Sequence, residues 1–239
     1  MGTGAIAPTE SDRYRRVAAP LHTVLILVAS AAWAWRGFLN AEHLRSAVNL
    51  NRVGMYGRTM LFEWLMFGFV ILGVKLHGTP LRAVLGERWD SARQVLRDFG
   101  MAIVFLVVSI FITSILAGHT HGGGPDPAVQ FLLPHGKVEL AVWMVLSLTA
   151  GICEETLYRG YLQRQFMALT NNAPLGILLS AAMFGSAHAY QGFAKAVQIG
   201  VLGAMYGGFA HWRRSVRPGM IAHTLQDVLG GLFAGSIKH

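Results

Sequence analysis

The stretch that decides the fold is residues 138–153, VELAVWMVLSLTAGIC, which runs directly into the charged sequence EETLYR at 154–159. An apolar run near 20 residues is long enough to cross a hydrocarbon core of about 30 Å. Backbone groups in lipid must be hydrogen-bonded within the spanning segment, so such runs form helices. Working outward, we find comparable runs at about 18–39, 56–76, 99–117, 175–190, 195–212 and 217–235. The sequence therefore predicts an all-α, polytopic helical membrane protein with about seven transmembrane helices.

The composition agrees with this fold class. Only 13% of the 239 residues are charged, whereas a soluble domain carries roughly 25%. Hydrophobic residues make up 53% of the chain and the mean hydropathy is +0.44. These values exclude an ordinary cytosolic domain and a disordered chain, and the single cysteine, Cys153, excludes a disulfide scaffold. The net charge of +8 is explained by basic cytoplasmic loops, so no nucleic-acid partner is required.

The distribution of Lys and Arg predicts an orientation. With the N-terminus inside, the cytoplasmic side collects more basic residues than the outside, which favours a cytoplasmic tail over residues 1–17 and residence in the plasma (inner) membrane. The first apolar run continues to Leu39, so we expect an uncleaved anchor rather than a signal peptide. Residues 18–137 are expected to hold the N-terminal transmembrane helices. Their connector near 79–98 mixes apolar residues and Arg at helical spacing, which suits either an amphipathic helix on the membrane face or a solvated helix.

The fourth apolar run ends in a group of charged residues. Burying ionisable side chains in a membrane costs free energy, so such residues usually have a functional role. On a helix Glu155 and Arg159 are four residues apart, so they lie on one face and can pair. Glu154 is turned about 100° away and is free to face another group, which suits a general base. The alternative is an interfacial ion-pair cluster that only ends the helix.

Two later runs carry polar pairs at the same spacing: Phe184 and His188 in FGSAH, and His223 and Asp227 in HTLQD. We expect the three segments to converge, because each polar group lowers the burial cost of the others. Peptide hydrolysis needs an activated water, a donor for the developing oxyanion and a proton for the leaving amine. Glu154, His188 and His223 can supply all three.

In this order on three late helices, the motifs resemble the CPBP group, which comprises the CAAX prenyl endoproteases and the bacteriocin-processing or immunity membrane proteins, also called the Abi family. The resemblance covers roughly residues 138–235 within the predicted core at 138–239. It implies an all-helical intramembrane endopeptidase, described in the family as a metalloprotease. The implied partners are the lipid bilayer and a peptide or protein substrate, with a prenylated CAAX substrate as the eponymous case.

The resemblance also implies a role for each matching residue. Glu154 would activate the attacking water and His188 would hold or polarise it. His223 and Asp227 would stabilise the oxyanion or orient the neighbouring His. The paired Glu155 and Arg159 would hold the site together or position substrate, and Phe184 would pack beneath His188.

Two features leave the chemistry open. Many relatives carry Asn where this chain has Asp227, and an ionised Asp can accept a hydrogen bond but cannot donate one. Asp227 therefore suits fixing a His tautomer or ligating a metal better than donating to an intermediate. Glu154, His188 and His223 would suit a divalent metal, with zinc as the first candidate, yet the same residues can activate water without a metal.

Other residues receive simpler interpretations. Cys153 is not expected to act as a nucleophile, because a buried thiol beside carboxylates is disfavoured as a thiolate. Glu63 is interpreted either as a snorkelling or locally paired acid or as an acid that reaches the same cavity. The repeats Gly200-Ala204-Gly208 and Gly203-Gly207 predict a seam of close helix packing. Competing functions are a non-catalytic membrane scaffold or bacteriocin self-immunity protein, and a transporter with a proton relay.

Overall fold

The structure is a computed structural model that describes residues 14–47, 49–121 and 127–234. Most of the predicted N-terminal tail therefore lies outside the described residues. Within these ranges every regular element is a helix, as predicted. The elements are α1 (Pro20–Ser46), α2 (Arg52–Leu76), α3 (Arg82–Leu85), α4 (Ala92–His121), α5 (Pro127–Gln130), α6 (Lys137–Glu154), the π-helix η2 (Glu155–Leu162), α7 (Gln163–Thr170), α8 (Ala173–Ala187), the 3₁₀ turn η3 (Ala189–Gln191), α9 (Phe193–Arg213) and α10 (Arg217–Ala234).

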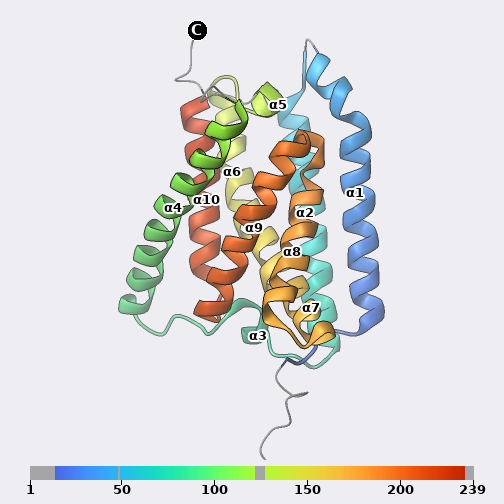
Figure 1. The fold of residues 1–239 in the computed structure, drawn as a ribbon, viewed down its shortest axis with the longest axis vertical. Helices are drawn as coiled ribbons and strands as arrows, with labels where there is room; N and C mark the ends of the chain where they lie inside the picture. Colours follow the sequence, from blue (N-terminus) through green and yellow to red (C-terminus); the bar gives the residue numbers. More distant parts are fainter. Residues whose placement is uncertain (1–13, 48, 122–126, 235–239) are drawn as a thin grey trace, which may run out of the picture.

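The seven predicted spans coincide with α1, α2, α4, α6, α8, α9 and α10, which run alternately up and down the bundle (Figure 1). Among the described residues, four helical stretches are long and apolar enough to cross a bilayer: α1, α2, residues 92–116 of α4, and residues 137–170. The helix α8 is apolar but shorter. The fold is that of a polytopic helical membrane protein, and the polar residues of the predicted site lie on α6, η2 and α10 and directly after α8.

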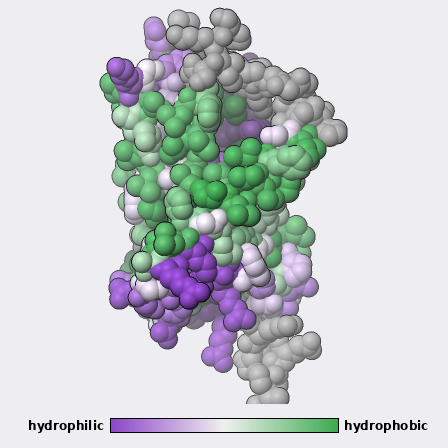
Figure 2. Space-filling model, turned by 90° about the vertical axis from the view of Figure 1, so that its left-hand side faces the viewer, coloured by the Kyte–Doolittle hydropathy of each residue, from purple (hydrophilic) through white to green (hydrophobic). Residues whose placement is uncertain are grey.

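The outer surface of α4 is suited to lipid. Figure 2 shows a broad hydrophobic band across this side of the molecule, above a hydrophilic lower end. Apolar side chains of α4 point outward in this band, with Val104 66% and Phe111 66% exposed. Large apolar side chains are unfavourable when exposed to water but make favourable contacts with lipid chains. The protein is therefore an integral membrane protein.

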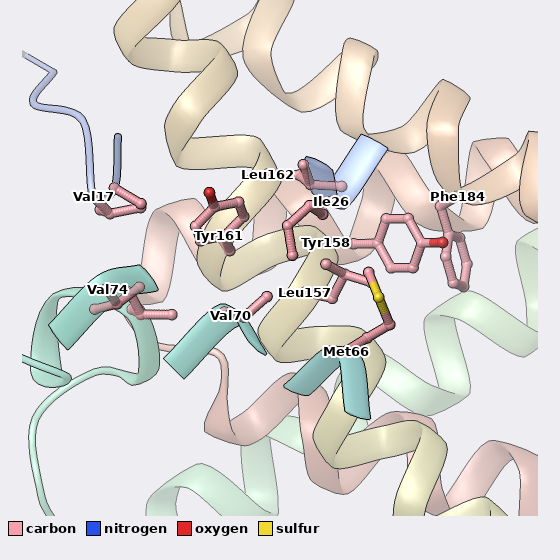
Figure 3. Close-up of a cluster of buried hydrophobic side chains, with 12 residues drawn as sticks. Val17, Ile26, Met66, Val70, Val74, Leu157, Tyr158, Tyr161, Leu162 and Phe184 are labelled. Atoms are coloured by element: carbon pink, nitrogen blue, oxygen red, sulfur yellow. The ribbon is translucent and has the colours of Figure 1, made fainter. Parts of the chain in front are cut away.

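The largest apolar core lies where α1, α2, η2 and α8 meet (Figure 3). Ile26 of α1, Val70 of α2 and Tyr161 of η2 are fully buried there, and Phe184 extends the cluster toward the predicted site. A smaller cluster joins α4, α9 and α10 through Leu106, Tyr206 and Ala222. The two clusters fix η2 and α10, the elements that carry the charged residues, between the outer helices.

The backbone after Glu154 differs from the expected regular α-helix. Residues 155–162 form a π-helix, in which the N–H of Gln163 donates to the carbonyl of Tyr158, five residues earlier. All eight residues of η2 are buried. Gly160 allows the wide turn to pack closely, because a Cβ at this position would lie 2.8 Å from the carbonyl oxygen of Val84. Segments of π-helix occur frequently at functional sites.

The connector near 79–98 is not one continuous helix. The four-residue α3 ends at Gly86, whose φ of 92° favours glycine, and the chain is irregular until α4 begins at Ala92. The segment instead docks on the lower end of the bundle. Val84 is fully buried, and the carbonyl of Leu85 accepts hydrogen bonds from the Val216 N–H and the Ser215 hydroxyl just before α10.

Candidate active site

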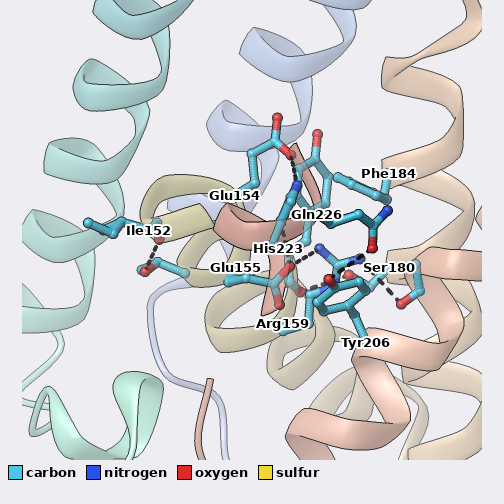
Figure 4. A network of polar contacts seen from close by, with 12 residues as sticks. Ile152, Glu154, Glu155, Arg159, Ser180, Phe184, Tyr206, His223 and Gln226 are labelled. Carbon is cyan, nitrogen blue, oxygen red and sulfur yellow. Dashed lines mark hydrogen bonds and ion pairs between the residues drawn. The ribbon is translucent and has the colours of Figure 1, made fainter. Parts of the chain in front are cut away.

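A buried ion pair lies at the centre of the site. The Arg159 guanidinium donates to Glu155 Oε1 at 2.7 Å, and both side chains are at most 2% exposed (Figure 4). A second Arg159 nitrogen donates to the carbonyl of Gly203 on α9 at 3.3 Å. The guanidinium also lies 4.2 Å from the centre of the Phe184 ring and 5.2 Å from that of Tyr206. Because these rings and the carbonyl surround the charge, Arg159 can stay buried beside Glu155.

The predicted glycine seam brings α9 against this ion pair. A Cβ on Gly203 would lie 3.0 Å from Phe184 Cδ1 and 3.4 Å from the Arg159 guanidinium. A Cβ on Gly207 would lie 2.6 Å from Gln163 Oε1. In contrast, no atom lies within 4 Å of the position of a Cβ on Gly208. The seam therefore follows the Gly203 and Gly207 face of the helix, and Gly208 is not part of it.

His223 of α10 connects the ion pair to two further carboxylates. Its Nδ1 lies 3.1 Å from Glu155 Oε1, and its Nε2 lies 3.8 Å from Glu154 Oε2 and 3.6 Å from Asp227 Oδ2. Both ring nitrogens therefore face carboxylate oxygens. An imidazole that donates Nδ1–H to Glu155 is held in one orientation, and a proton on Nε2 would point at the space between Glu154 and Asp227.

Backbone contacts hold α10 in this position. A Cβ on Gly151 of α6 would lie 2.8 Å from the carbonyl oxygen of Met220 and would clash with Thr224. The Trp143 indole donates to the carbonyl of Asp227 at 2.8 Å. Small residues at such interfaces let membrane helices approach closely. The distance between His223 and Glu154 is thus set by direct packing of α6 against α10.

The two neighbouring acids are separated as predicted. The Glu155 side chain is fully buried, whereas 18% of the Glu154 side chain is exposed. Glu154 is the last residue of α6 and Glu155 the first of η2. Figure 4 shows the two carboxyl groups on opposite sides of the His223 ring. Glu155 is engaged with Arg159, and Glu154 is left to face the exposed side of the site.

His188 lies at the edge of this arrangement, directly after α8. Its Nδ1 lies 2.9 Å from the Phe184 carbonyl, so Nδ1 carries the hydrogen and Nε2 is left as an acceptor. The Phe184 ring packs edge-on against His188 at 4.8 Å between ring centres and against His223 at 6.2 Å. The packing predicted for Phe184 is thus present, and this one ring supports both His side chains. His188 also interacts electrostatically with Asp227.

The sequence left two interpretations open for Glu63, a snorkelling or locally paired acid and an acid that reaches the site. Glu63 of α2 is only 8% exposed, so it does not snorkel to the surface. Its Oε2 has no hydrogen-bond partner among the described residues. Its position inside an apolar run was the available signal, but a span alone does not tell which neighbour the residue faces.

A metal site would require the predicted ligands Glu154, His188 and His223 to lie around one point. Among the described residues, no group of three or more His, Cys, Asp or Glu side chains is arranged so that it could hold a metal ion. His188 and His223 each direct Nδ1 to a protein oxygen, at the Phe184 carbonyl and at Glu155. Such Nδ1 contacts are also made by His residues that bind a metal through Nε2. The predicted ligands nevertheless do not lie together as a ligand set among the described residues, so no step is derived through a metal.

Comparison with known families adds to this geometry. Residues 135–229 match the family model described as type II CAAX prenyl endopeptidase Rce1-like. Over this segment, which is less than half of the chain, the protein is similar to the CAAX protease family. The match contains all six predicted site residues, and it supports an intramembrane endopeptidase acting on a protein or peptide in the bilayer. No curated protein and no solved structure matches the chain.

Proposed function

We propose that this chain hydrolyses a peptide bond of a membrane-associated protein or peptide with a water molecule that Glu154 activates. The observation that carries the proposal is the position of His223, whose two nitrogens face Glu155 on one side and Glu154 and Asp227 on the other. A buried ion pair thereby orients an imidazole beside a partly exposed carboxylate. Such an arrangement supplies both a base and a hydrogen-bond donor in a water-poor site.

The steps follow from these roles. Glu154 takes one proton from a water that His188 Nε2 also contacts, and the resulting hydroxide oxygen bonds to the substrate carbonyl carbon. The carbonyl oxygen becomes an oxyanion, which accepts a hydrogen bond from Nε2–H of His223. Glu154 then returns its proton to the amide nitrogen as the C–N bond breaks. The products are a carboxylic acid and an amine, which then exchange a proton to become a carboxylate and an ammonium group, and Glu154 ends ionised as it began.

A lateral groove offers the substrate a route from the bilayer. A cavity of about 360 Å³ lies between α1 and α8, with Ala34 and Trp35 on one wall and Ala187 and Ala189 on the other. Ala187 and Ala189 flank His188 in the chain. We therefore expect an apolar part of the substrate to occupy the groove while its peptide bond reaches His188.

We also expect cleavage near the cytoplasmic face. His223 lies six residues from the start of α10, a rise of about 9 Å. The same end of the bundle holds the start of α1, the α3 region and the link between α9 and α10 (Figure 1). These segments carry many of the basic residues that favour the inside of the membrane, including Arg82, Arg213 and Arg217.

The test uses the purified chain in proteoliposomes with a peptide that ends in a prenylated CAAX sequence, and the same peptide without the lipid. Glu154→Gln should lower kcat by about 10²- to 10⁴-fold, because the base is lost. The matched control is Glu87→Gln, an exposed acid outside the membrane helices, which should cleave like the wild type. Mass spectrometry of the products checks both results.

Further measurements test whether cleavage needs a metal and whether the chain is a protease or a non-catalytic scaffold. Treatment with a metal chelator should leave cleavage unchanged, and a loss that zinc restores would contradict the metal-free step. Full cleavage by Glu154→Gln would contradict its role as base. If a deletion strain is rescued by Glu154→Gln and no peptide is cleaved, the chain acts as a scaffold or immunity protein instead.

A further inference from the structure

A charged cluster at the end of the bundle where α4 begins has no part in the proposed cleavage. At its centre is Asp98 of α4, a buried acid that joins three segments of the chain. Its Oδ2 accepts a hydrogen bond from the Trp89 indole at 2.9 Å, and its Oδ1 accepts one from Arg213 of α9 at 3.0 Å. Arg97 also donates to Oδ1, at 3.4 Å. The carboxylate thus ties the connector before α4 to the end of α9.

The cluster holds more positive charge than this carboxylate balances. The Arg217 guanidinium lies 5.1 Å from the centre of the Trp89 ring, so it belongs to the same cluster. Three guanidinium groups against one carboxylate leave a net charge of +2, from Arg97, Arg213 and Arg217 against Asp98. The Arg97 side chain is 55% exposed, and only one of its nitrogens donates to Asp98. A guanidinium has five N–H donors, and exposed ones in a fixed fork suit a phosphate group.

The surface beside the cluster is apolar. Val104 and Val108 lie seven and eleven residues after Arg97, on the same face of α4, and both are exposed. The rise from Arg97 to Val108 is about 16 Å, roughly half of a hydrocarbon core of about 30 Å. Figure 2 shows a hydrophilic patch directly below the hydrophobic band on this side. Arg97 therefore lies at the depth of the lipid headgroups, with a surface for one acyl chain beyond it.

A tryptophan marks the same depth on the neighbouring helix. Trp212 near the end of α9 is 69% exposed, and its ring packs against Phe209 at 6.2 Å between ring centres. Phe209 in turn stacks on Phe105 of α4 at 4.4 Å, so the two helices are in contact just above the cluster. Exposed indoles are typical of the headgroup level of a membrane protein.

We propose that this cluster binds the headgroup of an anionic phospholipid, with the phosphate on Arg97 and an acyl chain along the Val104 and Val108 face of α4. A soluble anion would match the charge but would leave this apolar face without a partner. The binding is separate from the proposed cleavage. Because α10 begins at Arg217, a bound lipid also braces the helix that carries His223.

A first experiment compares ligands that share only part of this chemistry. The purified full chain in uncharged detergent is titrated with short-chain phosphatidylglycerol, with phosphatidylcholine of the same chain length, or with inorganic phosphate. A ligand that binds only the folded state raises the unfolding temperature. Phosphatidylglycerol should give the largest, saturating rise. Equal rises with phosphatidylcholine would overturn the proposed charge recognition, and equal rises with inorganic phosphate would make this an ion site instead of a lipid site.

A second experiment locates the binding with two matched variants. Arg97→Gln should weaken the apparent affinity for phosphatidylglycerol about fivefold, the usual contribution of one basic residue near anionic lipid. Arg82→Gln is the control, because it removes the same charge at the same end of the bundle (Figure 1), from an exposed residue whose ion-pair partner is Glu87. It should bind like the wild type. The unfolding temperature without lipid shows that both variants fold.

Two outcomes of this comparison contradict the proposal. Equal weakening in both variants would mean that general surface charge attracts the lipid, and wild-type affinity in a folded Arg97→Gln variant would place the headgroup elsewhere. If Arg97→Gln does not fold, the three titrations of the wild type still decide between lipid, ion and no binding. None of these measurements needs cleavage, so they stay decisive even if the chain hydrolyses no peptide.

Discussion

Two sides of one helical turn differ in how well their charges are matched. On the η2 side, Glu155 contacts Arg159 at 2.7 Å and His223 at 3.1 Å, and aromatic rings enclose the guanidinium. On the α6 side, Glu154 is partly exposed, and its nearest ion-pair partner is His223 at 3.8 Å. We call these the locked side and the open side. A group must be free to exchange protons in order to catalyse, so only the open side is suited to the chemistry.

This difference gives Glu154 and Glu155 separate roles, although the sequence motif does not distinguish the two acids. A buried ion pair contributes little net stability, because the loss of hydration offsets the attraction. Its value here is positional, since Glu155 fixes the ring of His223 at Nδ1 and Phe184 rests on Arg159. The locked side therefore orients the groups of the open side. Removing a charge from the locked side should therefore have a larger effect than a change at the open side.

The largest effect is expected from removing the buried cation. Arg159→Met should destabilise the protein by about 3–5 kcal/mol, because Glu155 would be left as an uncompensated buried charge. Thermal or denaturant unfolding in detergent measures the loss. The double variant Glu155→Gln with Arg159→Met removes both charges and should recover much of this stability. Equal destabilisation of the single and double variants would show that Arg159 acts by packing rather than by charge.

A smaller effect is expected from the glycine seam. Gly203→Ala would place a methyl group 3.0 Å from Phe184, the ring that supports both His side chains. Overpacking of this kind costs about 1–3 kcal/mol, so unfolding in detergent should occur at lower temperature and cleavage should slow. Gly208→Ala is the matched control on the same helix, because nothing lies within 4 Å of its added methyl group. Equal stability of the two variants would show that the close packing at Gly203 does not contribute to stability.

The parts of the fold and site that the sequence predicted are those that depend on local spacing. Hydrophobic runs placed all seven helices, and the i, i+4 spacing of Glu155 and Arg159 placed their ion pair. The separation of Glu154 from Glu155 also follows from helical rotation alone. Local geometry fixes each of these features, so no knowledge of neighbouring helices was needed.

The features that the sequence did not reveal depend on which helix packs against which. Glu63 is buried because α2 packs along α6, and the π-helix at η2 accommodates the packing of Gly160 on Val84. His22 of α1 is a further example, because its ring nitrogens lie 2.7 Å from the Tyr161 hydroxyl and 3.0 Å from the Phe69 carbonyl. Such contacts join residues far apart in the chain, and periodicity within one segment carries no information about them.

The smallest effect is expected where the open side meets the bilayer. Ala34→Trp would fill the groove between α1 and α8, whose lining includes Ala187 and Ala189 on either side of His188 in the chain, and it leaves the charged residues untouched. We expect KM for a lipid-bearing peptide to rise about tenfold, roughly 1.4 kcal/mol of lost binding, with kcat nearly unchanged. Val28→Trp is the matched control, because Val28 is an exposed residue of the same helix outside the groove lining. A fall in kcat with constant KM would mean that the indole disturbs His188 instead, and equal kinetics in both variants would place substrate entry elsewhere.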